Sequence, residues 1–164
     1  MKTIFLIRHA KSSWGIEGIA DIDRPLNDRG YLDAYKMAGR LKKFSPSGIL
    51  VSSPAIRAVS TALIFSRAFE SDSSAILIHP LLYESGAKQY LEVISALPDE
   101  FSTAFLFGHN PVITATSNLI GGTVLAELPT TGIVGIEFDM LSWKKTKESP
   151  GRMVFYDFPK NTVR

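Results

Sequence analysis

The 164-residue sequence predicts a single three-layer α/β/α domain, with a mostly parallel central sheet and an antiparallel hairpin at one edge. Short apolar runs alternate with longer amphipathic segments along the chain, which is the pattern of α/β proteins. The first run, within residues 3–7, is continuously apolar, as expected for a central strand covered on both faces. The last two runs, residues 133–138 and 153–158, have a polar loop between them, which indicates the hairpin.

The remaining elements follow from the same periodicity. No repeat, low-complexity tract or linker interrupts residues 1–164 in the sequence, so we expect one domain. Further strands are expected at residues 48–52, 75–79 and 103–107. Helices are expected at residues 28–43, 54–69, 87–97 and 111–120.

The first two helices carry signals for their start and their buried face. Asn27 or Asp28 can cap the first helix, and Pro54 lies near the start of the second, where its missing N–H costs little. Spacings of three and four indicate a buried stripe in the first helix, formed by Tyr31, Tyr35, Ala38 and Leu41. For the second helix we expect the inward-facing residues to be Ile56, Val59, Leu63 and Phe69.

The composition excludes several classes of protein. A formal net charge of +2 is too balanced for the basic face of a nucleic-acid-binding protein. Without cysteine the chain has no disulfide, thiolate metal site or cysteine nucleophile, and a reducing compartment is the simpler expectation. The N-terminal apolar run stops at Arg8, and no apolar run approaches the roughly 18 residues of a membrane span. We therefore expect a cytoplasmic protein.

Two arginines and two histidines follow the ends of different predicted strands. Arg8 and His9 follow the first strand, Arg57 lies in the first turn of the second helix, and His109 follows the fourth strand. Because ligands of open α/β sheets bind outside the carboxyl ends of the strands, we expect these four side chains to converge. Guanidinium groups and helix N-termini both bind anions. The predicted ligand is a doubly charged phosphoryl group.

Other interpretations of these residues are weaker. A single histidine near a strand end is usually structural, and His79 has neither a glycine nor an arginine beside it, so we treat it as structural. The chain lacks the Gly-x-Ser-x-Gly motif of serine hydrolases and the Gly-Lys-Ser/Thr of P-loop enzymes. A zinc site would have to use three histidines that are far apart in the sequence.

Four segments, ordered along nearly the whole chain, resemble the motifs of one known family. Residues 6–14, Leu-Ile-Arg-His-Ala-Lys-Ser-Ser-Trp, resemble a strand followed by an Arg-His-Gly signature. Residues 23–26 (Asp-Arg-Pro-Leu) resemble the segment before the first helix, residues 52–58 a second arginine motif, and Gly108-His109-Asn110 a second histidine motif. By these motifs the chain resembles the phosphoglycerate mutase-like branch of the histidine phosphatase superfamily, and most closely its small SixA-type phosphohistidine phosphatases.

The resemblance implies roles for the matching residues. His9 would be the nucleophile that forms a covalent phosphohistidine, while Arg8, Arg57 and a protonated His109 would hold the phosphoryl oxygens. Ser12 and Asn110, which belong to the motifs, would also contact the substrate. The implied reaction needs no metal and no cofactor.

The general acid is left open. In mutase-like members a glutamate after the third strand protonates the leaving group, and Glu84 lies at about that place in the sequence. A solvated loop carboxylate is the alternative. Ala10 replaces the signature glycine, which removes a residue able to adopt positive φ. The segment between the second arginine motif and the second histidine motif is short, so the pocket should be shallow.

These features favour dephosphorylation of phosphohistidine on a protein. Without a general acid to protonate the leaving group, an imidazole leaves more readily than an alkoxide. The alternatives are a broad-specificity small-molecule phosphomonoesterase and a non-catalytic phosphate-binding module. The partner would accordingly be a phosphorylated protein or a small phosphorylated substrate, with no nucleic acid and no membrane; the oligomeric state is left open. Within loop 142–151, the basic residues 143–147 are interpreted as solvated, with a docking surface for an acidic partner as the alternative.

Overall fold

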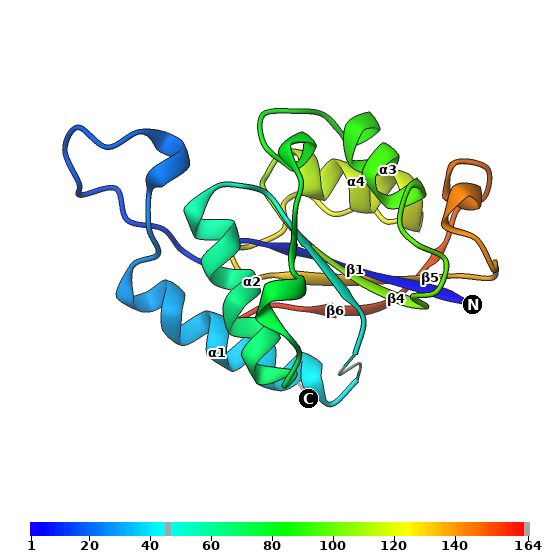
Figure 1. The fold of residues 1–164 in the computed structure, drawn as a ribbon, viewed down its shortest axis with the longest axis horizontal. Coiled ribbons are helices and arrows are strands. Elements are labelled where there is room, and N and C mark those ends of the chain that lie inside the picture. Colours follow the sequence, from blue (N-terminus) through cyan, green and yellow to red (C-terminus); the bar gives the residue numbers. More distant parts are fainter. Residues whose placement is uncertain (45–46, 163–164) are drawn as a thin grey trace.

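The computed structural model describes residues 1–44 and 47–162, which form a six-stranded sheet between two layers of helices (Figure 1). The strands are β1 (Lys2–Arg8), β2 (Ile49–Ser52), β3 (Leu77–Ile78), β4 (Thr103–Gly108), β5 (Ile133–Phe138) and β6 (Arg152–Asp157). They lie in the order β3-β2-β4-β1-β5-β6. The first four are parallel, whereas β5 is antiparallel to β1 and β6 is antiparallel to β5. The predicted fold class, including the antiparallel edge, is confirmed.

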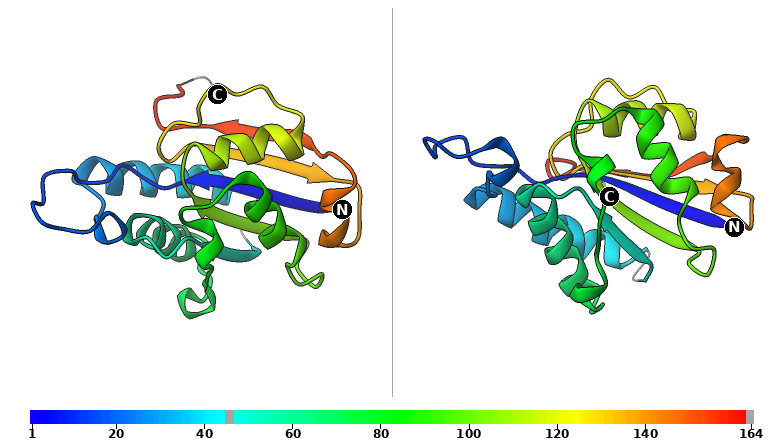
Figure 2. Two further views of the ribbon diagram at one scale, coloured as in Figure 1. Left: turned by 90° about the horizontal axis from the view of Figure 1, so that it is seen from above. Right: turned by 45° about the horizontal axis from the view of Figure 1, so that its top comes forward.

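Helices cover both faces of this sheet, as Figure 2 shows. One layer holds α1 (Asp28–Lys42) and α2 (Ile56–Ala68), and the other holds α3 (Ala87–Ser95) and α4 (Val112–Gly121). Ile4 and Leu6 of β1 belong to the core on the α3–α4 side, while Phe5 and Ile7 belong to the core on the α1–α2 side. Both faces of β1 are therefore buried, which explains its uninterrupted apolar sequence.

No helix within the described residues is both long and apolar enough to traverse a lipid bilayer.

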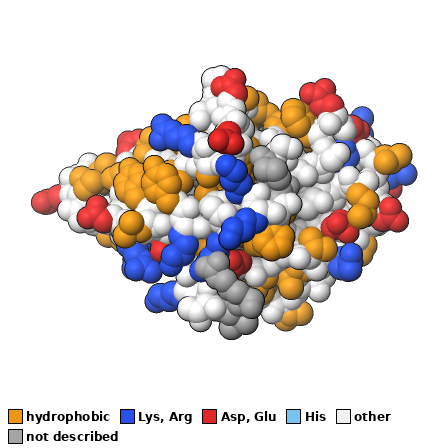
Figure 3. All heavy atoms as spheres, turned by 90° about the horizontal axis from the view of Figure 1, so that it is seen from below, with side chains coloured by type: hydrophobic (Ala, Val, Ile, Leu, Met, Phe, Trp, Pro, Cys, Tyr) orange, Lys and Arg blue, Asp and Glu red, His pale blue; other side chains and the backbone are white. Residues whose placement is uncertain are grey.

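The buried stripes expected for α1 and α2 were right in part and wrong in part. The Asn27 side chain caps α1 as expected, accepting a hydrogen bond from the Gly30 N–H. However, Tyr31 and Tyr35 are 44% and 56% exposed. Hydrophobic side chains gather toward one end of the face of the molecule that Figure 3 shows. Ala38 and Leu41 are buried as expected, and the other buried residues of α1 are Gly30, Asp33, Ala34 and Met37.

In α2 the same error occurs. Ile56 is 42% exposed and Val59 and Leu63 are half-buried, although Phe69 is buried as expected. The buried side of α2 includes Ala58, Thr61, Ala62 and Phe65. Because α1 and α2 contact each other and the sheet, small side chains let the layers approach closely, and larger side chains are turned outward.

Two connecting segments also differ from expectation. The predicted strand 75–79 is reduced to Leu77 and Ile78, both exposed at the sheet edge, after a 3-10 turn at Ser73–Ala75. Loop 142–151 contains a short 3-10 helix, Trp143–Lys147, whose three lysines are exposed as expected. Trp143, in contrast to the expectation, is fully buried and its Nε1 donates to the Phe101 carbonyl at 2.9 Å, so one side of this segment covers the core.

Candidate active site

The four residues expected to converge lie together at the carboxyl ends of β1, β2 and β4. β1 and β4 pair in register, with Arg8 opposite Gly108, so the residues that follow, His9 and His109, are neighbours. Their ring centres are 5.1 Å apart. Arg57 extends from the first turn of α2, and both arginines interact electrostatically with both histidines.

The geometry of His9 leaves one ring nitrogen available as a nucleophile. Its Nδ1 lies 2.7 Å from the carbonyl oxygen of Ala10, which can only accept a hydrogen bond. The ring proton is therefore assigned to Nδ1, and Nε2 carries the lone pair. Burial lowers the pKa of His9 to about 3, and the nearby charges of His109, Arg57 and Arg8 act in the same direction. His9 is consequently neutral at pH 7.

Ala10 fits where the family signature has glycine. Its φ is not among the positive values in the chain, so the position does not require glycine. The methyl group is fully buried in the core on the α1–α2 side. The backbone N–H of Ala10 donates to Oγ1 of Thr61 at 3.0 Å, which fixes the backbone directly after His9 to α2.

Three buried nitrogen atoms around the histidines have no hydrogen-bond partner within the described residues: Nε of Arg8, Nε of Arg57 and Nδ1 of His109. Both outer nitrogens of Arg57 and one outer nitrogen of Arg8 are already engaged. Nη1 of Arg8 donates to the Leu128 carbonyl at 2.9 Å, and Nη1 of Arg57 donates to the Asp21 carbonyl at 2.7 Å. Since unpaired buried N–H groups are rare, this set indicates a place for an oxyanion.

Ser53 and Tyr90 position His109, and sequence reasoning missed both. Oγ of Ser53 lies 2.7 Å from Nε2 of His109, and the Tyr90 hydroxyl accepts the His109 backbone N–H at 3.1 Å. A Cβ atom at Gly108 would overlap the Tyr90 hydroxyl, which explains glycine before this histidine. Ser53 lies inside the second arginine motif, but nothing in the sequence spacing indicates that its hydroxyl reaches another strand.

His109 is neutral in this pocket, which differs from the protonated form expected above. Burial lowers its pKa to about 4, with Arg57 acting in the same direction and Asp21 in the opposite one. A neutral His109 still donates a hydrogen bond through Nδ1 when its Nε2 accepts one from Ser53.

Asp21 is a further residue of the site that sequence reasoning missed. It lies in a 3-10 turn, Asp21–Asp23, within the loop that follows β1. Its Oδ2 accepts from the Tyr83 hydroxyl at 2.6 Å and from Nη2 of Arg57 at 3.1 Å, and its Oδ1 accepts from Nε of Arg24 at 3.1 Å. The Tyr83 hydrogen bond, supported by the two arginines, holds the pKa of Asp21 well below its usual range.

The two residues expected to contact substrate have partners inside the protein. Oγ of Ser12 accepts from Nη1 of Arg24 at 2.6 Å. The Asn110 amide donates to the Leu128 carbonyl at 2.8 Å and accepts from the Thr114 hydroxyl at 2.6 Å. Ser12 therefore holds Arg24, and Asn110 holds the loop that also binds Arg8.

Glu84 lines the same cavity as His109. This cavity has a volume of about 240 Å³, and its wall also includes Asp21, Arg57 and Tyr83. Glu84 is exposed and has a φ of 52°, in the left-handed region. Its position beside the histidine pocket is compatible with proton transfer to a leaving group.

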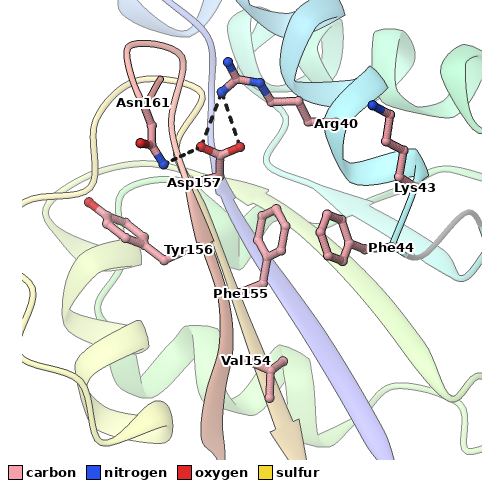
Figure 4. Close-up of a pocket in the computed structure, with 8 residues that line it drawn as sticks. All are labelled: Arg40, Lys43, Phe44, Val154, Phe155, Tyr156, Asp157 and Asn161. Atoms are coloured by element: carbon pink, nitrogen blue, oxygen red, sulfur yellow. Dashed lines mark hydrogen bonds and ion pairs between the residues drawn. The ribbon is translucent and has the colours of Figure 1, made fainter. Parts of the chain in front are cut away.

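Two features lie outside this site. His79 accepts the Leu81 N–H at 3.2 Å and so caps the short 3-10 helix Pro80–Leu82, as expected of a structural histidine. A separate cavity of about 430 Å³ lies between the end of α1 and β6, where Arg40 pairs with Asp157 at 3.3 Å (Figure 4). The residues expected in the site do not line it.

No group of three or more potential metal-ligating side chains is found within residues 1–44 and 47–162.

The chain belongs to branch 1 of the histidine phosphatase superfamily, whose family model matches residues 4–102, more than half of the chain. The resemblance found in the sequence is confirmed. A relative from Mycobacterium leprae, itself uncharacterized, is 31% identical over 146 residues, a match that covers 77% of this chain and 84% of that protein.

Solved structures extend the similarity over nearly the whole chain. A protein of Agrobacterium tumefaciens assigned as the phosphohistidine phosphatase SixA is 27% identical, with a TM-score of 0.79, and 96% of this chain and 98% of that one are covered. The protein histidine phosphatase SixA complexed with tungstate has the same fold, with a TM-score of 0.83 at 19% identity and coverage of 98% and 99%.

Proposed function

We propose that this protein is a phosphatase that transfers the phosphoryl group of a phosphohistidine-bearing protein to His9 and then to water. The observation that carries the proposal is a neutral His9 ring, fixed by Ala10 with Nε2 free, beside three buried donors without partners. A nucleophile and a set of preorganised donors are the two components that covalent phosphoryl transfer requires.

In the first step, Nε2 of His9 attacks phosphorus in line with the leaving group. The substrate P–N bond breaks and its electron pair returns to the leaving ring nitrogen. The unpaired nitrogens of Arg8, Arg57 and His109 donate to the phosphoryl oxygens. One lost donor of this kind costs about 10²–10³ in rate.

In the second step, a water oxygen attacks the phosphoryl group on His9. The bond from phosphorus to Nε2 breaks, its electron pair returns to the ring, and inorganic phosphate forms. One water proton passes to solvent or to a carboxylate of the cavity.

The leaving group favours phosphohistidine over a phosphate ester. An alkoxide needs a proton in the transition state, whereas an imidazole is a weaker base and leaves more readily. Glu84 lines the cavity but is exposed, and no hydrogen bond or ion pair of the described residues holds its carboxylate in one position. A protein substrate in the cytoplasm is part of this proposal.

A broad-specificity phosphomonoesterase of the same superfamily is the second candidate. The observation that favours it is the presence of Glu84 in the cavity wall together with His109. A non-catalytic phosphate-binding module is less favoured, because a pure binding site does not need the lone pair that Ala10 leaves on Nε2 of His9.

A comparison of rates tests the proposal. A phosphohistidine peptide, a phosphoserine peptide and a sugar phosphate are each assayed for phosphate release at equal concentration. We expect the phosphohistidine peptide to have the highest kcat/KM. A higher value for the sugar phosphate would establish the phosphomonoesterase instead, and no release from any of them would favour the binding module.

A further inference from the structure

The position of Asp21 is unusual for a site that binds a dianion. Its carboxylate lies on the wall of the cavity that also contains Arg57 and His109. A fixed negative charge there repels a phosphoryl group and engages Nη2 of Arg57, while the backbone carbonyl of the same residue engages Nη1, so neither outer nitrogen is left for phosphate oxygens. Such a charge disfavours anionic substrates unless the substrate also carries a positive charge beside its phosphorus.

The carboxylate is held firmly and still has an accepting position. Oδ2 receives two donors, Tyr83 and Arg57, whereas Oδ1 receives one, Arg24. A carboxylate offers about four accepting positions. The side chain is 51% exposed and lines the cavity, so it is accessible to a ligand.

Arg24 is itself fixed on two sides, by Ser12 at 2.6 Å and by the Trp14 ring at 3.5 Å from its guanidinium carbon. The ring of Tyr83 lies edge-on to that of His109, with centres 5.6 Å apart. Tyr83 therefore contacts both the Asp21 carboxylate and His109, the histidine proposed to bind the phosphoryl group.

We propose that Asp21 accepts a hydrogen bond from the second ring nitrogen of the substrate phosphohistidine, and so selects substrates whose leaving group is a protonated imidazole. This inference rests on the proposed function and identifies Asp21 as the residue that recognises the leaving group of the substrate. A phosphate ester has no N–H at this position, so Asp21 opposes its binding without any compensating contact.

The proton balance explains why this contact assists the reaction. When the second ring nitrogen of the substrate is protonated, the phosphorylated ring is a cation. Attack by His9 breaks the P–N bond, the electron pair neutralises the ring, and a neutral imidazole departs that still carries its N–H. This step needs no proton from Glu84, because the leaving group arrives already protonated.

Asp21→Asn tests the inference, with Asp23→Asn, an exposed carboxylate in the same turn, as the matched control. The measured quantity is the ratio of kcat/KM for a phosphohistidine peptide to kcat/KM for p-nitrophenyl phosphate. We expect this ratio to fall about tenfold or more in Asp21→Asn, the size of one hydrogen bond to a charged group, and to be unchanged in Asp23→Asn. Equal losses on both substrates would overturn the inference and leave the proposed function intact.

The pH profile distinguishes two roles of Asp21. One is accepting a hydrogen bond from the leaving group, and the other is positioning Arg57. The groups that face Asp21 are Arg24, Arg57 and Tyr83, with Glu84 and His109 in the same cavity. We expect the alkaline limb for the phosphohistidine peptide to move to lower pH in Asp21→Asn, because the carboxylate no longer keeps the bound ring protonated. An unmoved limb would contradict the inference.

A substrate-side test needs no variant. A phosphoimidazole methylated on its second nitrogen remains a cation but has no N–H to donate. We expect the wild-type protein to hydrolyse it more slowly than the N–H compound, after correction for the uncatalysed rates. Equal rates would overturn the inference, whereas failure of the wild-type protein on every phosphoimidazole, with p-nitrophenyl phosphate hydrolysed, would refute the proposed substrate itself.

Discussion

Oγ of Ser53 lies 2.7 Å from Nε2 of His109, and the same oxygen accepts the backbone N–H of Ala55 at 3.2 Å. With that N–H as its donor partner, the hydroxyl hydrogen of Ser53 is free to point at Nε2. This arrangement assigns the ring proton to Nδ1, the buried atom without a partner, and makes neutral His109 a donor to a phosphoryl oxygen.

Ser53→Ala should therefore lower kcat by about 10-fold, because the hydroxyl no longer fixes the tautomer of His109 and buried Nε2 loses its partner. Steady-state hydrolysis of p-nitrophenyl phosphate measures kcat and KM separately. Ser52→Ala is the matched control, since Ser52 is equally buried but donates to the Ser53 carbonyl instead. An unchanged kcat in Ser53→Ala would refute the role of this hydroxyl.

The two buried histidines of the site, His9 and His109, should make stability depend on pH. Their pKa values of about 3 for His9 and about 4 for His109 lie below the value of about 6.5 in an unfolded chain. Between these limits the unfolded state binds more protons, so the stabilising contribution is complete above about pH 6.5 and is lost as the pH falls toward 4 and then 3.

Urea unfolding at about pH 7.5 and about pH 5 measures this effect. In His109→Asn, the loss of unfolding free energy between the two pH values should be smaller than in the wild-type protein. His79→Asn serves as the control, because this ring caps a short helix outside the cavity. An identical pH dependence in wild type and His109→Asn would argue against a neutral His109.

Gly108→Ala should destabilise the fold and impair the site together. The new methyl group overlaps the Tyr90 hydroxyl, which holds both the His109 N–H and the Leu82 carbonyl. We expect a loss of about 1–3 kcal/mol in unfolding free energy. Adding Tyr90→Phe removes the overlapping oxygen. The loss of unfolding free energy in the double variant should therefore be smaller than the sum of the losses in the two single variants. Strict additivity would show that the methyl group does not meet this hydroxyl.

Glu84→Gln separates the two candidate substrate classes. If Glu84 protonates ester leaving groups, hydrolysis of an alkyl phosphate should fall at least about tenfold more than hydrolysis of a phosphohistidine peptide. Glu92→Gln, an exposed glutamate on α3, provides the comparison. Equal effects on the two substrates would remove Glu84 from the leaving-group side of the reaction.

The sequence predicted the fold and the meeting of His9 and His109 because both depend on simple rules. Apolar runs identified the strands, and parallel strands bring their carboxyl ends to one edge, where residues directly after β1 and β4 must be neighbours. Arg57 was found for the same reason, since it lies in the first turn of the helix after β2.

The residues that escaped prediction depend on tertiary contacts without periodicity. Asp21 reaches Arg57 through an irregular loop whose path no sequence pattern determines. The outward orientation of Tyr31 and Tyr35 has a related origin, because small residues such as Ala34 and Ala38 determine which side of α1 packs closely. Hydrophobicity alone favoured the larger aromatic side chains.

Trapping the reaction intermediate tests the central claim most directly. The wild-type protein is mixed with a ³²P-labelled phosphohistidine peptide, quenched within milliseconds in alkali, and digested to locate the label by peptide mapping. We predict a base-stable, acid-labile phosphoryl group on the peptide that contains His9, and none on His9→Ala. Label that persists in His9→Ala, or that maps to another residue of the wild-type chain, would contradict His9 as the nucleophile.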